Sequence, residues 1–159
     1  MKITVITVGK IKEKFYSDAI ADYGKRLSKY CKLEQVEVAD EKAPESLSLK
    51  EEEQIKVKEG ERILAKVQDG AYVICLAIEG KHLSSQELSE KMEQLSVNGD
   101  CHIVFIIGGS LGLSPSVLSR ANFKLSFSRM TFPHQLMKVV LLEQIYRSSM
   151  IHLEKLKLS

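Results

Sequence analysis

The stretch "VFIIGGSLGLS", residues 104–114, is the most informative part of the chain for its fold. Its apolar run has no polar face, which is typical of a strand buried on both sides near the centre of a sheet. Gly108 and Gly109 follow directly, and Gly112 comes soon after. Glycines at the end of a strand allow a tight turn or a close approach of the backbone to another group. The stretch therefore predicts a central strand followed by residues 108–112, which we call the glycine turn.

Predicted strands and helices alternate on both sides of this central strand. Alternating, β-branched residues predict strands, whereas apolar residues spaced by one helical turn predict helices. The predicted strands are 2–8, 32–38, 71–78, 101–107 and 123–128, and the predicted helices are 14–30, 49–66, 84–95, a short one from 114, and 133–150. This order predicts an α/β fold with a mostly parallel sheet flanked by helices. In such sheets, ligands bind beyond the carboxyl ends of the strands.

The composition predicts a single globular domain over residues 1–159. The chain is 44% hydrophobic and 28% charged, with only 3 prolines. No apolar run reaches the length of a membrane span, and the first strand has no signal-sequence pattern, so we expect a cytoplasmic protein without a membrane partner. The 3 cysteines, Cys31, Cys75 and Cys101, have no metal-binding spacing, and we predict no metal site. The net charge is only +2, so any nucleic acid must bind a local basic face.

The glycine turn matches neither of the common phosphate-binding motifs. Its glycines do not have the GxGxxG spacing, and no Gly-Lys-Ser/Thr sequence follows them. Two interpretations stay open from these residues alone. The glycines either form a structural turn between a strand and a helix, or they let the backbone lie against a ligand.

The stretch "SFSRMTFPHQLM", residues 126–137, contains an unusual loop. Phe127, Met130 and Phe132 alternate with polar residues where the chain leaves the last strand. Because loops usually run over the surface, these side chains either fill the core or surround an apolar ligand such as an adenine ring. The helix that follows is apolar on nearly every side from Leu136 to Ile145, which predicts a subunit interface.

These stretches, together with "DEKAPE" at residues 40–45, closely resemble the bacterial RlmH methyltransferases. These are small members of the SPOUT superfamily, also called YbeA-like or OrfX-like proteins, and the resemblance runs from residue 1 to about residue 147. It implies a SPOUT fold with a C-terminal deep trefoil knot, a homodimer, and S-adenosylmethionine (SAM) as cofactor. The implied reaction is methylation of N3 of a pseudouridine in a 23S ribosomal RNA stem-loop of the assembled ribosome.

The resemblance also implies a SAM site built from several strand ends. The matching residues are Leu76 at the end of the third strand, Gly108 in the glycine turn, and the loop of Phe127, Ser128, Arg129, Met130, Thr131 and Phe132. We call residues 127–132 the knot loop. By resemblance, the glycine turn lies against a bent SAM and the knot loop closes over its adenine.

The end of the chain departs from the family pattern. RlmH proteins end with an aromatic-His-basic tail such as Tyr-His-Lys, which contributes to the active site. This chain ends "YRSSMIHLEKLKLS", so it diverges from about residue 148, and His152 does not match the tail histidine. The catalytic residue is therefore left unassigned. Two alternative functions stay open: a SAM-binding dimer with weak or no catalysis, and a ribosome-associated structural dimer without a ligand.

Several charged residues have more than one interpretation. His134 is either a neutral general base or a histidine that caps or packs at the start of its helix. Arg129, Lys138 and Arg147 either contact RNA phosphates or are surface charges and ion-pair partners. A denser basic cluster after the first strand is a stronger candidate for RNA contact: Lys10, Lys12 and Lys14. The charged helix at residues 49–66 is interpreted as a solvated face.

Overall fold

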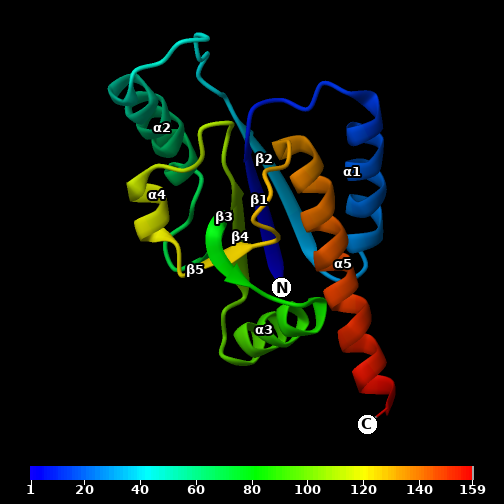
Figure 1. Ribbon diagram of the computed structural model, residues 1–159. Helices are drawn as coiled ribbons and strands as arrows, with labels where there is room; N and C mark the ends of the chain where they lie inside the picture. The colour runs from blue at the N-terminus through cyan, green and yellow to red at the C-terminus, as the bar shows by residue number, and fades with distance from the viewer. Residues whose placement is uncertain (159) are drawn as a thin grey trace.

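The computed structural model describes residues 1–158 and contains a five-stranded sheet between two layers of helices (Figure 1). The elements follow in the order predicted from the sequence. They are β1 (Lys2–Val8), α1 (Lys14–Leu27), β2 (Lys32–Val38), α2 (Leu49–Leu64), β3 (Tyr72–His82), α3 (Ser85–Val97), β4 (His102–Ile107), α4 (Pro115–Arg120), β5 (Phe123–Ser126) and α5 (His134–Leu158).

The strand order in the sheet is β2-β1-β4-β3-β5, and every neighbouring pair is parallel. The predicted central position of β4 is confirmed, because two strands lie on each side of it. Since all strands run the same way, their carboxyl ends meet at one edge, which we call the carboxyl edge. The opposite side, where the strands begin, is the amino edge.

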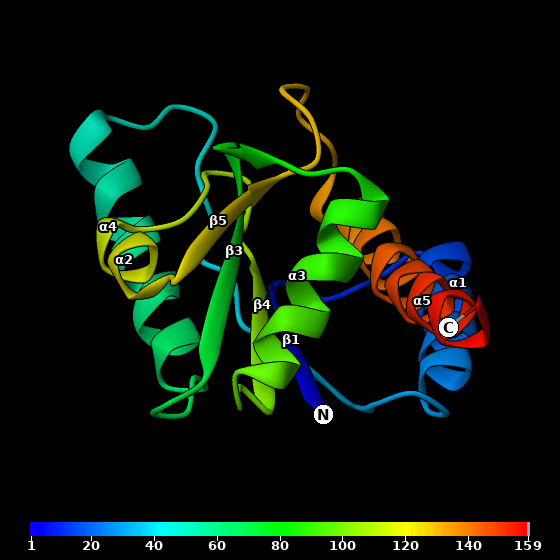
Figure 2. The same cartoon turned by 90° about the horizontal axis from the view of Figure 1, so that it is seen from below.

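Two helical layers cover the two faces of the sheet, as Figure 2 shows. Helices α1, α3 and α5 bury one face, and α2 and α4 bury the other. Alternate residues of β4 point into the two cores: Phe105 faces the first layer and Ile106 faces the second. Both side chains have no exposed surface, and burial of such a side chain contributes roughly 1.5–3 kcal/mol.

Helix α5 is longer than the sequence indicated. The predicted end near Met150 is wrong, because the helix continues to Leu158. No glycine or proline interrupts residues 148–158, and the Leu, Glu and Lys residues there are good helix formers. The helix begins at the carboxyl edge and its far end lies beyond the amino edge (Figure 1).

Strand β3 also extends past its predicted end at Ile78 and reaches His82. Its pairing with β5 is irregular, since Leu76 and Lys81 both pair with Leu125. Residues 77–80 therefore bulge out of the ladder at the carboxyl edge. A β-carbon on Gly80 would lie 2.8 Å from the Lys124 carbonyl oxygen, so glycine permits the close approach of the two strands.

Within residues 1–158, no helix combines the length and apolar character needed to cross a membrane. The same residues contain no group of three or more His, Cys, Asp or Glu side chains placed to hold a metal ion. The deep trefoil knot that the resemblance implies stays a prediction.

Candidate active site

The strand ends that the sequence singled out lie side by side at the carboxyl edge. Leu76 follows Cys75, which pairs with Ile106 of β4, and Leu76 itself pairs with Leu125 of β5. The glycine turn continues β4 and the knot loop continues β5. The sheet order β4-β3-β5 therefore brings Leu76, the glycine turn and the knot loop together, although they are far apart in the sequence.

The glycine turn folds tightly back on itself. The Gly112 N–H donates to the Gly109 carbonyl oxygen over 3.1 Å, and Gly112 has a φ of +91°, a conformation that favours glycine. A β-carbon on Gly108 would lie only 2.9 Å from Cδ2 of Leu113. The structural interpretation of the turn is therefore confirmed for these positions, whereas its contact with a ligand stays a prediction.

The knot loop places its apolar residues in two different environments. Its backbone is shaped by two hydrogen bonds: Ser126 Oγ donates to the Ser128 carbonyl oxygen (3.0 Å), and the Met130 N–H donates to Ser128 Oγ (2.9 Å). Phe127 packs against the core under α5. Met130 and Phe132, by contrast, are 72% and 39% exposed. Phe127 is thus half-buried against the core, and the side chains of Met130 and Phe132 leave apolar surface at the carboxyl edge.

A second group of side chains meets at the end of β1. Gly9 has a φ of +90°, and a β-carbon there would lie 3.4 Å from His134 Nε2 and 3.8 Å from Asp40 Cγ. His134 is the first residue of α5 and is half-buried. A histidine ring and a carboxylate therefore face the same turn. No local sequence pattern links these positions, because the sheet order and the α5 packing create the proximity.

Glu59 is a buried carboxylate that the sequence interpretation missed. It is 5% exposed, so the description of residues 49–66 as a solvated face is wrong here. Its Oε2 accepts the Glu41 N–H over 3.0 Å, and burial raises the pKa of this carboxyl above its ordinary value. A β-carbon on Gly109 would lie 3.1 Å from Glu59 Oε1. The neighbouring Gly60 was the available signal, because its missing side chain lets Ser114 of the α4 cap pack closely.

Glu59 and Arg62 together fix the loop that follows β2. Arg62 donates from Nη1 to the Ala39 carbonyl oxygen and from Nη2 to Glu41 Oε1, each over 2.9 Å. Both α2 side chains thus hold the start of the "DEKAPE" stretch beside the glycine turn. Two sequence motifs that are separate in the chain share one support at the carboxyl edge.

Three cationic residues, two on α5 and one in the knot loop, lie in different surroundings. Arg147 pairs with Glu143 on the same helix (Nη2 to Oε1, 2.6 Å), and this hydrogen bond raises the pKa of Arg147. Lys138 is only 2% exposed, and burial lowers its pKa, so its interpretation as a surface charge is wrong. Arg129, in the knot loop, is exposed as predicted for a residue that meets RNA or solvent.

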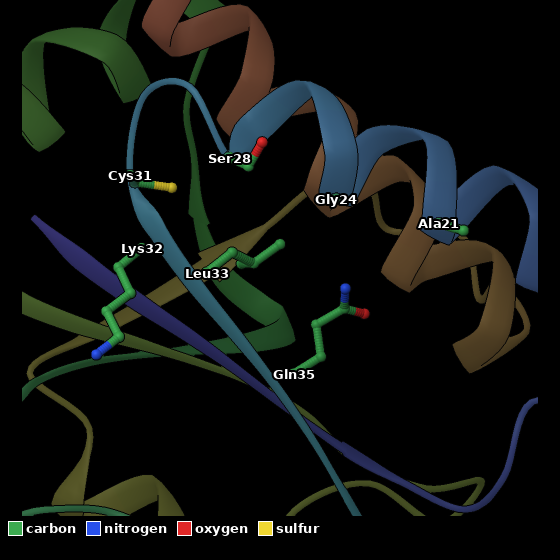
Figure 3. Close-up of a pocket in the computed structure, with 7 residues that line it drawn as sticks. All are labelled: Ala21, Gly24, Ser28, Cys31, Lys32, Leu33 and Gln35. Atoms are coloured by element: carbon green, nitrogen blue, oxygen red, sulfur yellow. The ribbon is translucent and has the colours of Figure 1, made fainter.

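A cleft lies elsewhere, between α1 and the edge strand β2 (Figure 3). This cleft of about 720 Å³ is lined by Ala21, Gly24, Ser28, Cys31, Lys32, Leu33 and Gln35. A neighbouring cleft of about 490 Å³ is lined by Ile11, Ser17, Ile20, Ala21, Gln35, Glu37 and Lys138. In the first cleft, burial raises the pKa of Cys31, which disfavours the reactive thiolate. Neither cleft includes Leu76, the glycine turn or the knot loop.

Comparison with known proteins adds to this geometry. A family model described as "Predicted SPOUT methyltransferase" matches residues 1–155. The chain belongs to the SPOUT methyltransferases. A similar member of this family, the "Ribosomal RNA large subunit methyltransferase H" of Bifidobacterium adolescentis, is 62% identical over 96% of each chain. The protein of the same name from Clostridioides difficile is 60% identical, also over 96% of each chain.

A solved structure with a similar fold is described as "a probable methylase family protein" from Haemophilus influenzae. It matches with a TM-score of 0.53 and 14% identity, covering 97% of this chain and 68% of the other. At this identity the likeness concerns the fold alone. The resemblance to SPOUT methyltransferases that was noted from the sequence is confirmed by the family match over nearly the whole chain.

Proposed function

We propose that this protein uses SAM to methylate N3 of a pseudouridine in the large-subunit ribosomal RNA of the assembled ribosome. Relatives about 60% identical are named as ribosomal RNA large subunit methyltransferases. The structural observation that carries the proposal is the meeting of Leu76, the glycine turn and the knot loop on the adjacent strands β3, β4 and β5. Ligands of parallel sheets bind at this kind of position.

The side chains at these strand ends fit the chemistry of SAM. Met130 and Phe132 present uncovered apolar surface. Leu76 is half-buried within β3, where it pairs with Leu125 just before the bulge. An adenosine group offers flat apolar faces that such residues cover, and edge atoms that backbone groups of the loops recognise. Leu76, Gly108 and residues 127–132 would hold the cofactor.

The chemistry requires a nucleophile held in line and a group that accepts a proton. When bound, SAM supplies the methyl group: the N3 lone pair forms the new N–C bond as the C–S bond breaks, and N3 loses its proton. His134 is the candidate acceptor of that proton, because its ring lies at the carboxyl edge against Gly9 and Asp40.

The alternative, a SAM-binding dimer with weak or no catalysis, is less well supported. Its basis was the divergent end of the chain. The relatives named as methyltransferases match 96% of this chain, which favours the catalytic function. A ribosome-associated dimer without a ligand gains no support, because the strand ends expected to hold a cofactor do lie together.

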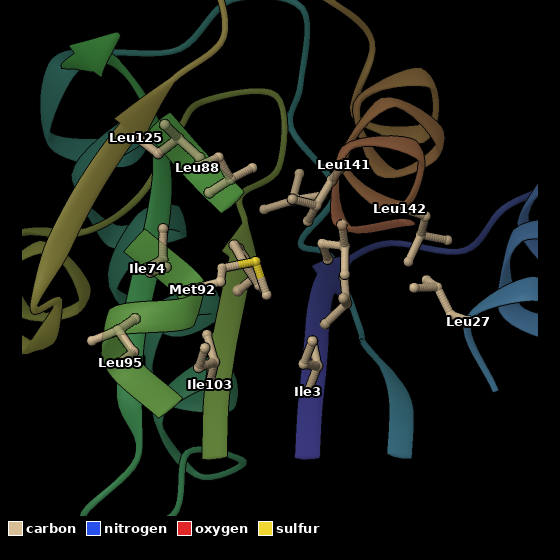
Figure 4. Close-up of a cluster of buried hydrophobic side chains, with 14 of the residues drawn as sticks. Ile3, Leu27, Ile74, Leu88, Met92, Leu95, Ile103, Leu125, Leu141 and Leu142 are labelled. Carbon is tan, nitrogen blue, oxygen red and sulfur yellow. The ribbon is translucent and has the colours of Figure 1, made fainter. Parts of the chain in front are cut away.

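A homodimer is part of the proposal, and its support lies on α1 and α5. Leu141 and Leu142 point into the core of the single chain (Figure 4), whereas Leu136 and Val140 are only half-buried. The Tyr146 ring on α5 lies 6.3 Å from that of Tyr23 and 6.1 Å from that of Tyr30, between ring centroids. Tyrosine-rich, partly exposed surfaces are typical of subunit interfaces. Light scattering at micromolar concentration should give twice the 17.9 kDa chain mass, and a monomer would contradict it.

The function is tested by incubating the protein and SAM with ribosomes from cells that lack this modification. Mass spectrometry of large-subunit rRNA fragments should show one added methyl group on the pseudouridine. Reactions without SAM and reactions with protein-free rRNA serve as controls. Absence of the methyl group from assembled ribosomes, or its presence on another nucleotide, would contradict the proposal.

A further inference from the structure

An exposed aromatic ring lies among lysines where the chain passes from β1 into α1. Phe15 is 65% exposed, although it is a large apolar side chain at the start of a helix. Lys10, Lys12 and Lys14 around it are exposed as well. We call these residues and the backbone between them the Lys10–Phe15 surface. Nothing in the site described above uses this surface.

The Phe15 ring is held from one side only. Its centroid lies 4.3 Å from that of Tyr16, with the planes inclined by 48°, and Tyr16 is half-buried. The ring therefore has an ordered neighbour while most of its own surface meets solvent. Single exposed aliphatic residues are ordinary on protein surfaces, and Val97 at the end of α3 is one example. A supported aromatic ring next to three exposed lysines in the chain is a different kind of feature.

This surface adjoins the candidate active site. It follows directly after Gly9, where an added β-carbon would meet His134 and Asp40. Ile11 and Lys138 line the same cleft, so the loop crosses the first turns of α5. In Figure 1 this loop and the start of α5 lie at the same end of the molecule. A molecule held in the candidate site could therefore extend over Phe15.

The local charge favours an anionic partner. Within residues 1–158, neither Lys10 nor Lys12 forms an ion pair, and Lys14 makes only an exposed contact with Asp18 at 3.6 Å. The first turn of α1 has no acidic residue, and the side chain of its N-cap residue Glu13 makes no capping hydrogen bond. The N–H groups at this helix start are thus available to a negative group.

We propose that the Lys10–Phe15 surface binds RNA next to the methylated nucleotide. Phe15 stacks on an unpaired base, and Lys10 and Lys12 contact the phosphates beside it. This inference rests on the proposed function, because it assumes an RNA substrate at the carboxyl edge. Aromatic rings on which bases stack, set among cations, are typical of single-stranded RNA recognition. A protein partner fits less well, since lysine is depleted in protein–protein interfaces.

Ribosome binding by three Phe15 variants tests the stacking. Unmodified ribosomes are titrated with Phe15→Ala, Phe15→Leu and Phe15→Trp, and the dissociation constant is measured by filter binding. Loss of a base stack should weaken binding about five- to 150-fold in the Ala and Leu variants. The Trp variant should bind like the parent, as should the control Val97→Ala. Ala or Leu variants that bind ribosomes as tightly as the parent overturn the stacking role.

The salt dependence of binding tests the phosphate contacts. Lys10→Gln and Lys12→Gln should each reduce the slope of log K against log salt by about 0.7, the value for single-stranded nucleic acid. Lys29→Gln is the matched control, because Lys29 is exposed just beyond the other end of α1. Equal slopes for Lys10→Gln and Lys29→Gln would overturn the phosphate contact.

The design separates failure of this inference from failure of the proposed function. If the parent methylates rRNA and the Phe15 variants bind ribosomes normally, only the RNA surface is refuted. If the parent binds ribosomes but adds no methyl group, the proposed function is refuted. If the parent binds no ribosomes, both are refuted. Light scattering of Phe15→Ala completes the test, because a changed oligomeric state with unchanged ribosome binding would assign the surface to a protein interface instead.

Discussion

The carboxyl edge and the α1–β2 cleft differ in the features that usually indicate a binding site. The cleft has a volume of about 720 Å³, but the groups that line it offer little chemistry. The carboxyl edge gathers a histidine, a buried carboxylate, a glycine turn and exposed apolar residues from loops that follow different strands. We therefore base the proposed site on the convergence of strand ends and not on the volume of a cleft.

The two histidines of α5 lie at opposite ends of the helix and differ in their surroundings. His134 opens the helix beside Gly9 and Asp40, whereas His152 lies near its far end, with Nδ1 3.5 Å from Glu93 Oε2 on α3. About eighteen residues of helix separate the two histidines, or roughly 27 Å at 1.5 Å per residue. The position relative to the sheet edges, rather than the residue type, makes His134 the candidate base.

The largest expected effect comes from the two histidines. His134→Ala should lower kcat for ribosome methylation by about a hundred- to ten-thousand-fold, because a positioned base is lost. Its affinity for SAM should stay within about twofold of the parent. The matched control, His152→Ala, should keep the parental kcat. Methylation is followed with labelled SAM at saturating ribosome concentration, and equal rates for both variants would place the base elsewhere.

Substitution of one glycine at the carboxyl edge and one in the cleft tests which region binds SAM. Gly108→Val should weaken SAM binding by about tenfold or more, since overpacking of a tight site costs roughly 1–3 kcal/mol. Gly24→Leu fills the cleft, where an added β-carbon would meet the flexible Gln35 side chain at 3.3 Å, and should bind SAM like the parent. Both affinities are measured by calorimetry.

The Gly108 variant also collides with Leu113, so a second variant is needed. The double variant Gly108→Val with Leu113→Ala removes the partner of that collision. If SAM binds the double variant like the parent, Gly108 serves only the shape of the turn. Continued loss of binding places the valine against the cofactor.

The order of elements could be predicted from the sequence, because apolar spacing reports each helix and strand locally. The central position of β4 followed from its lack of a polar face. The neighbourhood of Gly9, Asp40 and His134 could not be predicted, because it depends on strand order. Glu59 was hidden in a run of charged residues, since its partner is a backbone N–H of a distant loop. The end of α5 was misjudged because no residue there stops a helix.

A smaller effect is expected from the support beneath the glycine turn. Glu59 has a raised pKa in the folded state, so the folded protein binds this proton more tightly than the unfolded chain does. Stability from this group is present below the ordinary pKa of 4.5 and is lost as pH rises through the higher folded pKa. Glu59→Gln should remove the loss of stability at higher pH, because glutamine does not ionise. The amide oxygen of the glutamine can still accept the Glu41 N–H.

Urea unfolding across the pH range measures the effect. The stability difference between Glu59→Gln and the parent should grow as pH rises above 4.5 and vanish at lower pH. Glu59→Ala should lose about 1–3 kcal/mol at low pH, because the partly buried Glu41 N–H then lacks its acceptor. A parent and a Gln variant with parallel pH profiles would show that Glu59 is not stabilised in its protonated form.

The smallest effect is expected from the far end of α5. The last described turn of the helix, residues 154–158, is exposed and lies beyond the amino edge of the same chain (Figure 1). Removal of the residues after Leu153 should change the SAM dissociation constant by less than about twofold, because residues 154–158 lie far from the carboxyl edge. A large loss of SAM affinity, with an unchanged unfolding midpoint, would contradict the location of the site.

The central claim is that SAM binds at the carboxyl edge and not in the α1–β2 cleft. Two-dimensional NMR of the isotopically labelled protein, titrated with SAM, tests it residue by residue. Backbone amides of Leu76, Gly108 and the knot loop should shift, while those of Ala21, Gly24 and Gln35 should not. Shifts confined to the cleft amides, with the strand ends unchanged, would contradict the account.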